Sequence, residues 1–146
     1  MNKDPGRVLA VDPGEKRLGI AISDPTQTIA SSLCVIEHDN RNKDALAIYA
    51  LAQEHSVVMI LIGQPLNWDG SLNPQSSKSI RLAEEIQKLA DIPVKLWDEF
   101  GSTQKAQDSR RQMSVSRKKR SGHLDQVAAA VILQTFLDHQ IDQEVG

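Results

Sequence analysis

The hydrophobic pattern of this chain changes its period once, and this change limits the possible fold more than any other feature. Apolar residues first fall in three short runs typical of strands, at residues 7–11, 18–22 and 29–36. After residue 45, helical spacing alternates with apolar runs at residues 57–62 and 93–97. This order predicts an α/β fold whose five-stranded mixed sheet is antiparallel on one side and has helices on both faces.

Four helices are expected, and each is predicted from its buried stripe or its cap. The first ends near His55, and its stripe is Ala45, Leu46, Tyr49 and Ala52. The second follows a turn-rich loop at residues 64–74, and its stripe is Ile80, Ala83, Ile86 and Ala90. The third runs from an N-cap at Ser102 to Met113. The fourth covers residues 124–138, with a stripe of Leu124, Val127, Ala128, Val131 and Thr135.

A chain of 146 residues has the usual length of one domain, so residues 1–146 are expected to form a single domain with one core. Its expected irregular parts are a basic flexible loop at about residues 114–122 and a tail at about residues 139–146. No secretory signal is visible and no run approaches about 18 apolar residues, so a cytoplasmic location without a membrane is expected. Cys34 is the only cysteine, which excludes an internal disulfide and predicts a buried, inert thiol.

The net charge of −2 argues against a protein that coats nucleic acid non-specifically. Aromatic residues make up 3% of the chain, which is too few for the stacking platform of a single-strand binder. A local basic patch would still serve an enzyme that must release its product.

Three acidic sites fall at the ends of predicted elements. Asp12 closes the first strand, Asp98 and Glu99 close the fifth, and Asp125 opens the last helix. If strands one and five were parallel neighbours, their carboxyl ends would share the edge where open α/β sheets place their sites. Carboxylates so close would repel one another unless a cation neutralised them, and oxygen ligands without histidine favour Mg²⁺ or Mn²⁺.

Each carboxylate also has a purely structural interpretation. Asp12 could begin a turn, Asp125 could cap its helix, and the pair at residues 98 and 99 could simply be solvated. The coincidence of all three sites at element ends favours a catalytic centre that combines Asp12 and Asp125 with one of the two adjacent acids at positions 98 and 99. Asp98 is the alternative to Glu99, because neighbouring strand residues point to opposite faces.

Six cations are candidate contacts for substrate phosphates: Lys16, Arg17, Arg117, Lys118, Lys119 and Arg120. The first two follow Asp12 in the same hairpin, where a solvated charge is an equally good interpretation. The other four stand in a row shortly before Asp125, and their mutual repulsion predicts a solvated, mobile arm.

Four segments together resemble one known family, in the family's own order. They are residues 12–21 (Asp-Pro-Gly-Glu-Lys-Arg-Leu-Gly-Ile-Ala), residues 63–70 (Gly-Gln-Pro-Leu-Asn-Trp-Asp-Gly), residues 97–99 (Trp-Asp-Glu) followed by Ser-Thr at 102–103, and residues 125–134 (Asp-Gln-Val-Ala-Ala-Ala-Val-Ile-Leu-Gln). The chain is similar over residues 7–137 to the YqgF-type family, Holliday junction resolvase-like proteins that are assigned in bacteria as pre-16S ribosomal RNA nucleases.

The resemblance implies a ribonuclease H-like fold and a divalent-metal-dependent endonuclease that hydrolyses phosphodiester bonds in structured nucleic acid. It implies that Asp12, Glu99 and Asp125 are the catalytic metal ligands, with Mg²⁺ or Mn²⁺, two ions, as cofactor. Processing of the 5′ end of pre-16S rRNA is the implied role. The expected partner is nucleic acid, either pre-rRNA or branched DNA, and the expected assembly is a monomer or a weak homodimer.

The chain departs from the family pattern after Glu99. Family members usually carry arginine and a bulky residue there, whereas this chain has Phe100 and Gly101, so one positive side chain is missing. This departure would suit a catalytically weak nucleic-acid-binding factor in ribosome assembly, which is one alternative. A Holliday-junction-type DNA resolvase is another. An actin-like kinase, suggested by Asp12 and Gly14, would need a second domain for which the chain is too short.

Overall fold

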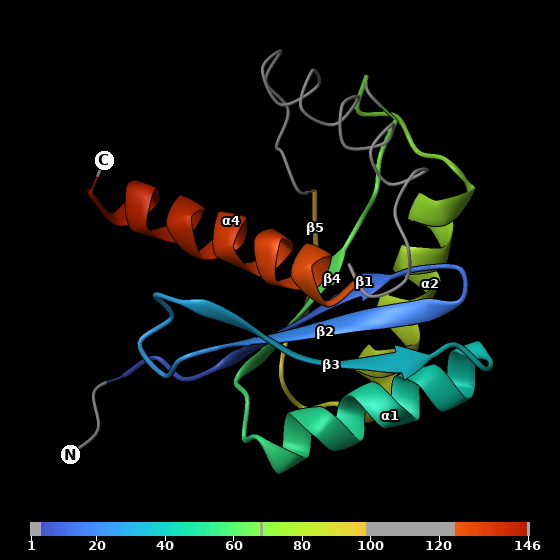
Figure 1. Cartoon of the computed structure of the whole chain (residues 1–146), viewed down its shortest axis with the longest axis horizontal. Coiled ribbons are helices and arrows are strands. Elements are labelled where there is room, and N and C mark those ends of the chain that lie inside the picture. The colour runs from blue at the N-terminus through green and yellow to red at the C-terminus, as the bar shows by residue number, and fades with distance from the viewer. Residues whose placement is uncertain (1–3, 68, 99–124, 146) are drawn as a thin grey trace.

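The fold is known from a computed structural model that describes residues 4–67, 69–98 and 125–145. Its strands are β1 (Val8–Pro13), β2 (Arg17–Ser23), β3 (Ala30–Glu37), β4 (Met59–Gly63) and β5 (Val94–Trp97). They form one sheet in the order β3-β2-β1-β4-β5 (Figure 1). The β1, β2 and β3 strands are antiparallel, while β4 and β5 run parallel to β1. The predicted α/β class and five-stranded mixed sheet are confirmed.

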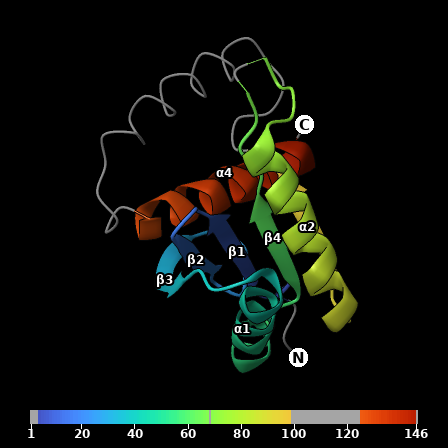
Figure 2. The same cartoon turned by 90° about the vertical axis from the view of Figure 1, so that its right-hand side faces the viewer.

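The helices of the described ranges cover both faces of this sheet, as predicted. They are α1 (Arg41–Glu54), α2 (Pro74–Leu89) and α4 (Asp125–Val145). Figure 2 shows α4 on one side of the strands and α1 on the other, with α2 beside β4. Leu9 and Val11 of β1 pack with α1 and α2, whereas Val8 and Ala10 pack with α4. The side chains of this one strand alternate between the two faces of the sheet and so contribute to two separate cores.

Asparagine caps explain where α1 and α2 begin. The Asn40 side chain accepts a hydrogen bond from the amide of Lys43 at 2.9 Å, and so begins α1. Asn73 and Ser76 form a reciprocal capping box at the start of α2. The Ser76 hydroxyl also donates to the carbonyl of Pro65 at 2.5 Å. This contact attaches the loop after β4 to α2, in agreement with the ordered loop that its turn residues predict.

The predicted helical stripes are partly wrong in all three described helices. In α2, Ala83 and Ile86 are buried as predicted, but Ile80 is only half-buried and Leu82 is buried as well. In α1, Leu46 is 54% exposed and Ile48 is buried instead. In α4, Val127 and Val131 are 50% and 42% exposed. The residues that α4 buries are Ala128, Ala129, Ile132, Leu133, Phe136 and Leu137. The small side chains of the two alanines allow the helix to approach the sheet closely. In this orientation the larger buried side chains of the same helix face also point toward the sheet.

The expected end of the last helix at Asp138 is wrong as well. α4 continues to Val145, so most of the predicted tail is helical. No glycine or proline interrupts residues 139–145, and His139 packs against the ring of Trp97. The predicted helix from Ser102 to Met113 and the predicted loop at residues 114–122 lie outside the described residues. None of the helices in the described ranges is long and apolar enough to span a membrane.

Candidate active site at the carboxyl end of the sheet

Asp12 lies near the end of β1 and is one of the few buried charged residues in the described ranges, with 7% of its surface exposed. Because strand side chains alternate, Asp12 shares a face with Val8 and Ala10, which pack against α4. Pro13 belongs to the opposite face, with Val11 and Leu9. The Asp12 carboxylate is therefore placed at the carboxyl end of a central strand, on the side covered by α4.

Glycines flank Asp12 on both neighbouring strands. Gly19 of β2 is its antiparallel partner, and Gly63 of β4 follows the paired residues Val11 and Ile62, which places it level with Asp12. A Cβ at Gly63 would lie 2.9 Å from Cδ1 of Ile132 on α4. The absence of side chains at these two positions allows α4 to approach the sheet closely beside Asp12.

The strand that carries the second acidic site is not the neighbour of β1. β4 lies between β1 and β5, and Gly63 pairs with Trp97, so the end of β5 is two strand spacings, about 10 Å, from Asp12. The assumption that the first and fifth strands are neighbours in the sheet is therefore wrong. The three strands are nevertheless parallel, so their carboxyl ends still share one edge.

Trp97 joins the end of β5 to α4. Its indole Nε1 donates a hydrogen bond to Oγ1 of Thr135 at 3.2 Å. Its ring meets Phe136 edge to face, with centroids 5.3 Å apart and an interplanar angle of 82°, and it also packs against His139. The residue directly before Asp98 is therefore held by the same helix that begins at Asp125.

The predicted metal ligands are only partly described. The side chain of Asp12 is described, α4 starts at Asp125 without a described side chain there, and Glu99 lies outside the described residues. The alternative ligand, Asp98, is half-buried directly after β5. The part of the chain that the structure describes contains no group of three or more histidine, cysteine or acidic residues that could hold a metal ion.

The predicted phosphate contacts divide between described and undescribed residues. Arg17 begins β2 two residues before Gly19, so the alternation of the strand places it on the same face as Asp12. Lys16 is exposed in the turn between β1 and β2. The four predicted arm residues, Arg117, Lys118, Lys119 and Arg120, lie outside the described residues, as do Phe100 and Gly101.

Cys34 is half-buried on β3 and has no predicted catalytic role. Burial, with a smaller contribution from the negative charge of Glu54, raises the pKa of its thiol above the ordinary value. A raised pKa keeps the thiol protonated near neutral pH, in keeping with the inert cysteine that the sequence predicts.

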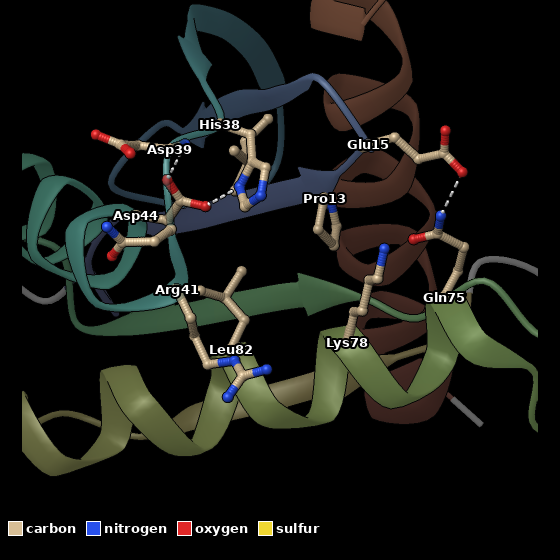
Figure 3. A pocket seen from close by; sticks show the side chains of 12 residues that line it. Pro13, Glu15, His38, Asp39, Arg41, Asp44, Gln75, Lys78 and Leu82 are labelled. Carbon is tan, nitrogen blue, oxygen red and sulfur yellow. Dashed lines mark hydrogen bonds and ion pairs between the residues drawn. The ribbon is translucent and has the colours of Figure 1, made fainter.

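A second concave site lies on the other face of the sheet, at the same end. It is a cleft of about 320 Å³ between the β1–β2 turn, the start of α1 and the first half of α2 (Figure 3). Its lining residues are Pro13, Gly14, Glu15, Leu18, His38, Asp39, Asn40, Arg41, Asp44, Gln75, Lys78 and Leu82. This cleft begins one residue after Asp12, but opens to the opposite side.

No sequence motif joins the parts of this cleft, so it could not be predicted from the sequence. Nδ1 of His38 lies 2.5 Å from the buried carboxylate of Asp44, whose other oxygen accepts the amide of Asp39 at 3.1 Å. Gln75 donates to the carboxylate of Glu15 at 3.1 Å across 60 positions of sequence. The capping signals around Asn40 and Asn73 could have located both helix ends, but not their approach to each other.

Comparison with known proteins gives one consistent group of relatives. A family model described as "RuvX: Holliday junction resolvase" matches residues 6–139. A "Putative pre-16S rRNA nuclease" of Roseiflexus sp. is 36% identical over 140 residues, which cover 96% of this chain and 99% of that protein. A protein of Desulforamulus reducens with the same description is 40% identical over 132 residues, which cover 90% and 96% of the two chains.

Solved structures with a similar fold are more distant in sequence. Thermus thermophilus RuvC in complex with a Holliday junction has a TM-score of 0.55 at 13% identity, with 93% of this chain and 96% of that chain covered. The fowlpox virus Holliday junction resolvase has a TM-score of 0.52 at 15% identity, with 91% and 99% covered. These likenesses confirm the expected ribonuclease H-like fold.

Proposed function

Because this chain belongs to the RuvX family of Holliday junction resolvase-like nucleases, which includes the pre-16S rRNA nuclease relatives, we propose that it is a metal-dependent endonuclease. Its substrate is structured nucleic acid, and its role is to process the 5′ end of pre-16S rRNA in the cytoplasm. The relatives support this role through their identity along almost the whole chain.

The observation that best supports catalysis is the position of Asp12. A buried carboxylate at the end of a central strand is rigid, and burial of its charge costs free energy that a catalytic role would justify. A turn-forming aspartate would not need to be buried on a face of the sheet that a helix covers.

Asp12, Glu99 and Asp125 are the proposed metal ligands. Asp12 fits a hard divalent cation, since it offers carboxylate oxygen in a site without cysteine or histidine neighbours on the strand. Two ions, Mg²⁺ or Mn²⁺, held by these carboxylates would supply an activated water and stabilise the leaving oxygen of in-line phosphodiester hydrolysis. Within the chain, Asp12 is the central ligand because its strand is packed on both faces.

Strand alternation favours Glu99 over Asp98 as the ligand from β5. Trp97 contacts Thr135 and Phe136, so it lies on the α4 face together with Asp12. If the strand continued beyond Trp97, the side chain at position 99 would return to this face, and that of Asp98 would lie on the opposite face.

Cations near this site are the proposed contacts for substrate phosphates. Arg17 is favoured over Lys16 because the register places it on the face of Asp12. Arg117, Lys118, Lys119 and Arg120 are proposed to add a phosphate-binding arm before Asp125. The protein is proposed to act as a monomer or a weak homodimer.

Two alternatives differ in substrate or activity. The description of the family as Holliday junction resolvase favours branched DNA. The Phe100–Gly101 departure favours a nucleic-acid-binding factor with weak catalysis. Cleavage assays with both precursor rRNA and four-way DNA junctions would separate these three possibilities.

The decisive experiment compares the wild type with Asp12→Asn, on both substrates, with Mg²⁺ or Mn²⁺ and with EDTA. We expect cleavage only by the wild type and only with metal, with a loss of at least about a thousandfold in the variant. The melting temperature of the variant without metal should stay close to that of the wild type. Cleavage that survives either EDTA or the Asp12→Asn change would contradict the proposal.

A further inference from the structure

The sheet ends on one side at β3, which is its longest strand. Among the strands of the described ranges, β3 pairs only with β2. Directly after β3, the amide of His38 donates to the carbonyl of Lys16 at 2.9 Å. Because bonding directions alternate along an antiparallel strand, the backbone amides and carbonyls of Val35 and Glu37 point away from β2. No residue that the structure describes forms a hydrogen bond with these outward groups.

The uncovered part of this edge is short and regular. The pairing of β3 with β2 shifts by one residue at Leu33, which is a β-bulge. Before the bulge, α4 covers the strand: Gln134 accepts a hydrogen bond from the amide of Ala30 and donates one to the carbonyl of Thr28, both at 2.9 Å. Residues 34–37 of β3 are therefore the uncovered edge.

The opposite edge of the sheet, β5, is protected. Oε1 of Gln87 on α2 accepts a hydrogen bond from the amide of Val94 at 3.0 Å, and β5 also carries the exposed Lys95. Covering side chains and lysines are common ways to prevent an edge strand from pairing with another chain. Residues 34–37, Cys-Val-Ile-Glu, contain neither lysine nor proline. The edge that remains available for pairing is therefore that of β3.

Apolar side chains of α4 lie beside the uncovered edge. Val127 and Val131 are 50% and 42% exposed, and they precede Gln134 by about two turns and one turn on the same side of the helix. Gln134 contacts the start of β3, and Figure 2 shows the first half of α4 above β2 and β3. The half-buried Val35 belongs to the same face, since it pairs with Gly19, the partner of Asp12. Backbone groups and apolar side chains are thus exposed together on this side of the molecule.

A second copy of the chain fits this surface, because antiparallel pairing of identical strands is symmetric. With a two-fold axis at Ile36, the backbone of Val35 meets that of Glu37 in the other copy, and the reverse pair forms as well. All the outward groups of residues 34–37 are then used. Glu37 lies opposite a neutral valine, so no like charges oppose each other across the pair. The same rotation places the two α4 helices on one side of the joined sheet, where their exposed valines cover each other.

We propose that this protein forms a symmetric homodimer through residues 34–37 of β3, flanked by Val127 and Val131 of α4. The two five-stranded sheets become one continuous sheet. This assembly goes beyond the proposed nuclease activity, on which it does not depend, and it selects the homodimer over the monomer. One short strand and one helix flank form a small contact, so the dimer is expected to depend on protein concentration.

The mass of the full-length protein in solution tests the proposal. Sedimentation equilibrium is measured from about 1 μM to about 1 mM without nucleic acid or metal. Val35→Pro removes an outward amide and leaves the bonds to β2 in place, because proline is tolerated where the amide of an edge strand faces solvent. Val131→Lys places a charge on the α4 flank and leaves β3 unchanged. Leu72→Lys is the matched control, because Leu72 is also an exposed aliphatic residue but lies in the loop after β4.

We expect the wild type to approach twice the mass of one chain as its concentration rises. Val35→Pro and Val131→Lys should each weaken the dimer at least about tenfold, whereas Leu72→Lys should behave as the wild type does. Circular dichroism checks that each variant is folded, and Val131→Lys decides the result if Val35→Pro is not. A wild type that keeps the mass of one chain at every concentration would overturn the proposal. A dimer that Val131→Lys weakens no more than Leu72→Lys does would also overturn it.

A disulfide cross-link tests the pairing of the strands directly. In a Cys34→Ser background, Ile36→Cys places two thiols at the two-fold axis, in a pair whose Cα atoms lie about 4.5 Å apart, which a disulfide can span. With diamide as the oxidant, this variant should form a covalent dimer at least about tenfold faster than Leu72→Cys in the same background. Equal rates would indicate random collision and contradict pairing through β3. Neither measurement involves cleavage, so a dimer that cleaves no nucleic acid would disprove the proposed function and leave the dimer assignment standing.

Discussion

Nε1 of Trp97, at the end of β5, donates a 3.2 Å hydrogen bond to Oγ1 of Thr135 on α4. The same hydroxyl donates to the carbonyl of Ile132 at 2.7 Å, so its orientation within the helix is fixed. Together with the packing of Trp97 against Phe136 and His139, this bond attaches the end of β5, just before Asp98, to the helix that begins at Asp125. We expect this attachment to help position the proposed ligands after β5 and at Asp125.

The first prediction is that Thr135→Val lowers the free energy of unfolding by about 1 kcal/mol, because the indole N–H loses its acceptor. We expect kcat to fall with little change in KM, since the bond positions ligands without touching substrate. Thr135→Ser keeps the hydroxyl and should restore kcat. Steady-state kinetics and urea unfolding of both variants check this. If Thr135→Val lost stability but kept its full kcat, the bond would have a structural role only.

A second prediction concerns the contact between β4 and α4. In Gly63→Ala the new Cβ would lie 2.9 Å from Cδ1 of Ile132 and 3.4 Å from the carbonyl oxygen of Val11. We expect a cost of about 1–3 kcal/mol and a loss of cleavage, because α4 must move away from the sheet beside Asp12.

The compensating change tests the cause of that loss. Ile132→Val removes the obstructing methyl group, so the double variant should recover much of the cleavage rate. Its loss of unfolding free energy should be smaller than the sum of the losses in the two single variants. A double variant no better than Gly63→Ala alone would place the strain at the backbone of Val11 instead.

A third prediction separates the two acidic residues after β5. Glu99→Gln should reduce the cleavage rate far more than Asp98→Asn, because a side chain two positions after Trp97 would return to the face of Asp12 if the strand continued. The metal concentration needed for half-maximal rate should also rise in Glu99→Gln. The two substitutions remove the same charge, so each serves as the control for the other. The reverse ranking would assign the ligand to Asp98.

The fourth prediction tests the basic arm. Replacing Arg117, Lys118, Lys119 and Arg120 by alanine should raise KM and leave kcat at saturating substrate close to wild type. The salt dependence of binding should flatten by roughly 0.9 in log-log slope for each lost contact to duplex DNA. Filter binding at several salt concentrations measures this slope. An unchanged slope would show that these residues do not contact the phosphate backbone.

The sequence alone determined the five strands, the existence of the three described helices and the choice of Asp12 as a candidate site residue. Each strand and helix has a periodic pattern of apolar residues that is visible in the sequence. The cap residue Asn40 and the turn-rich loop at residues 64–74 lie next to the elements that they delimit. The family motif around Asp12 is likewise continuous in sequence. These features are local, so the pattern of residues was sufficient to predict them.

The tertiary structure alone decided that β4 separates β1 from β5, that α4 buries Ile132 rather than Val131, and that Arg41 and Lys78 line one cleft. Strand order and helix rotation depend on how side chains from distant segments pack, and one helical stripe differs from the next by a single residue step. The cleft combines residues 13–18, 38–44 and 75–82, which no local pattern connects. Only packing brings such segments together, because the free energy that orders them comes from contacts between them rather than within them.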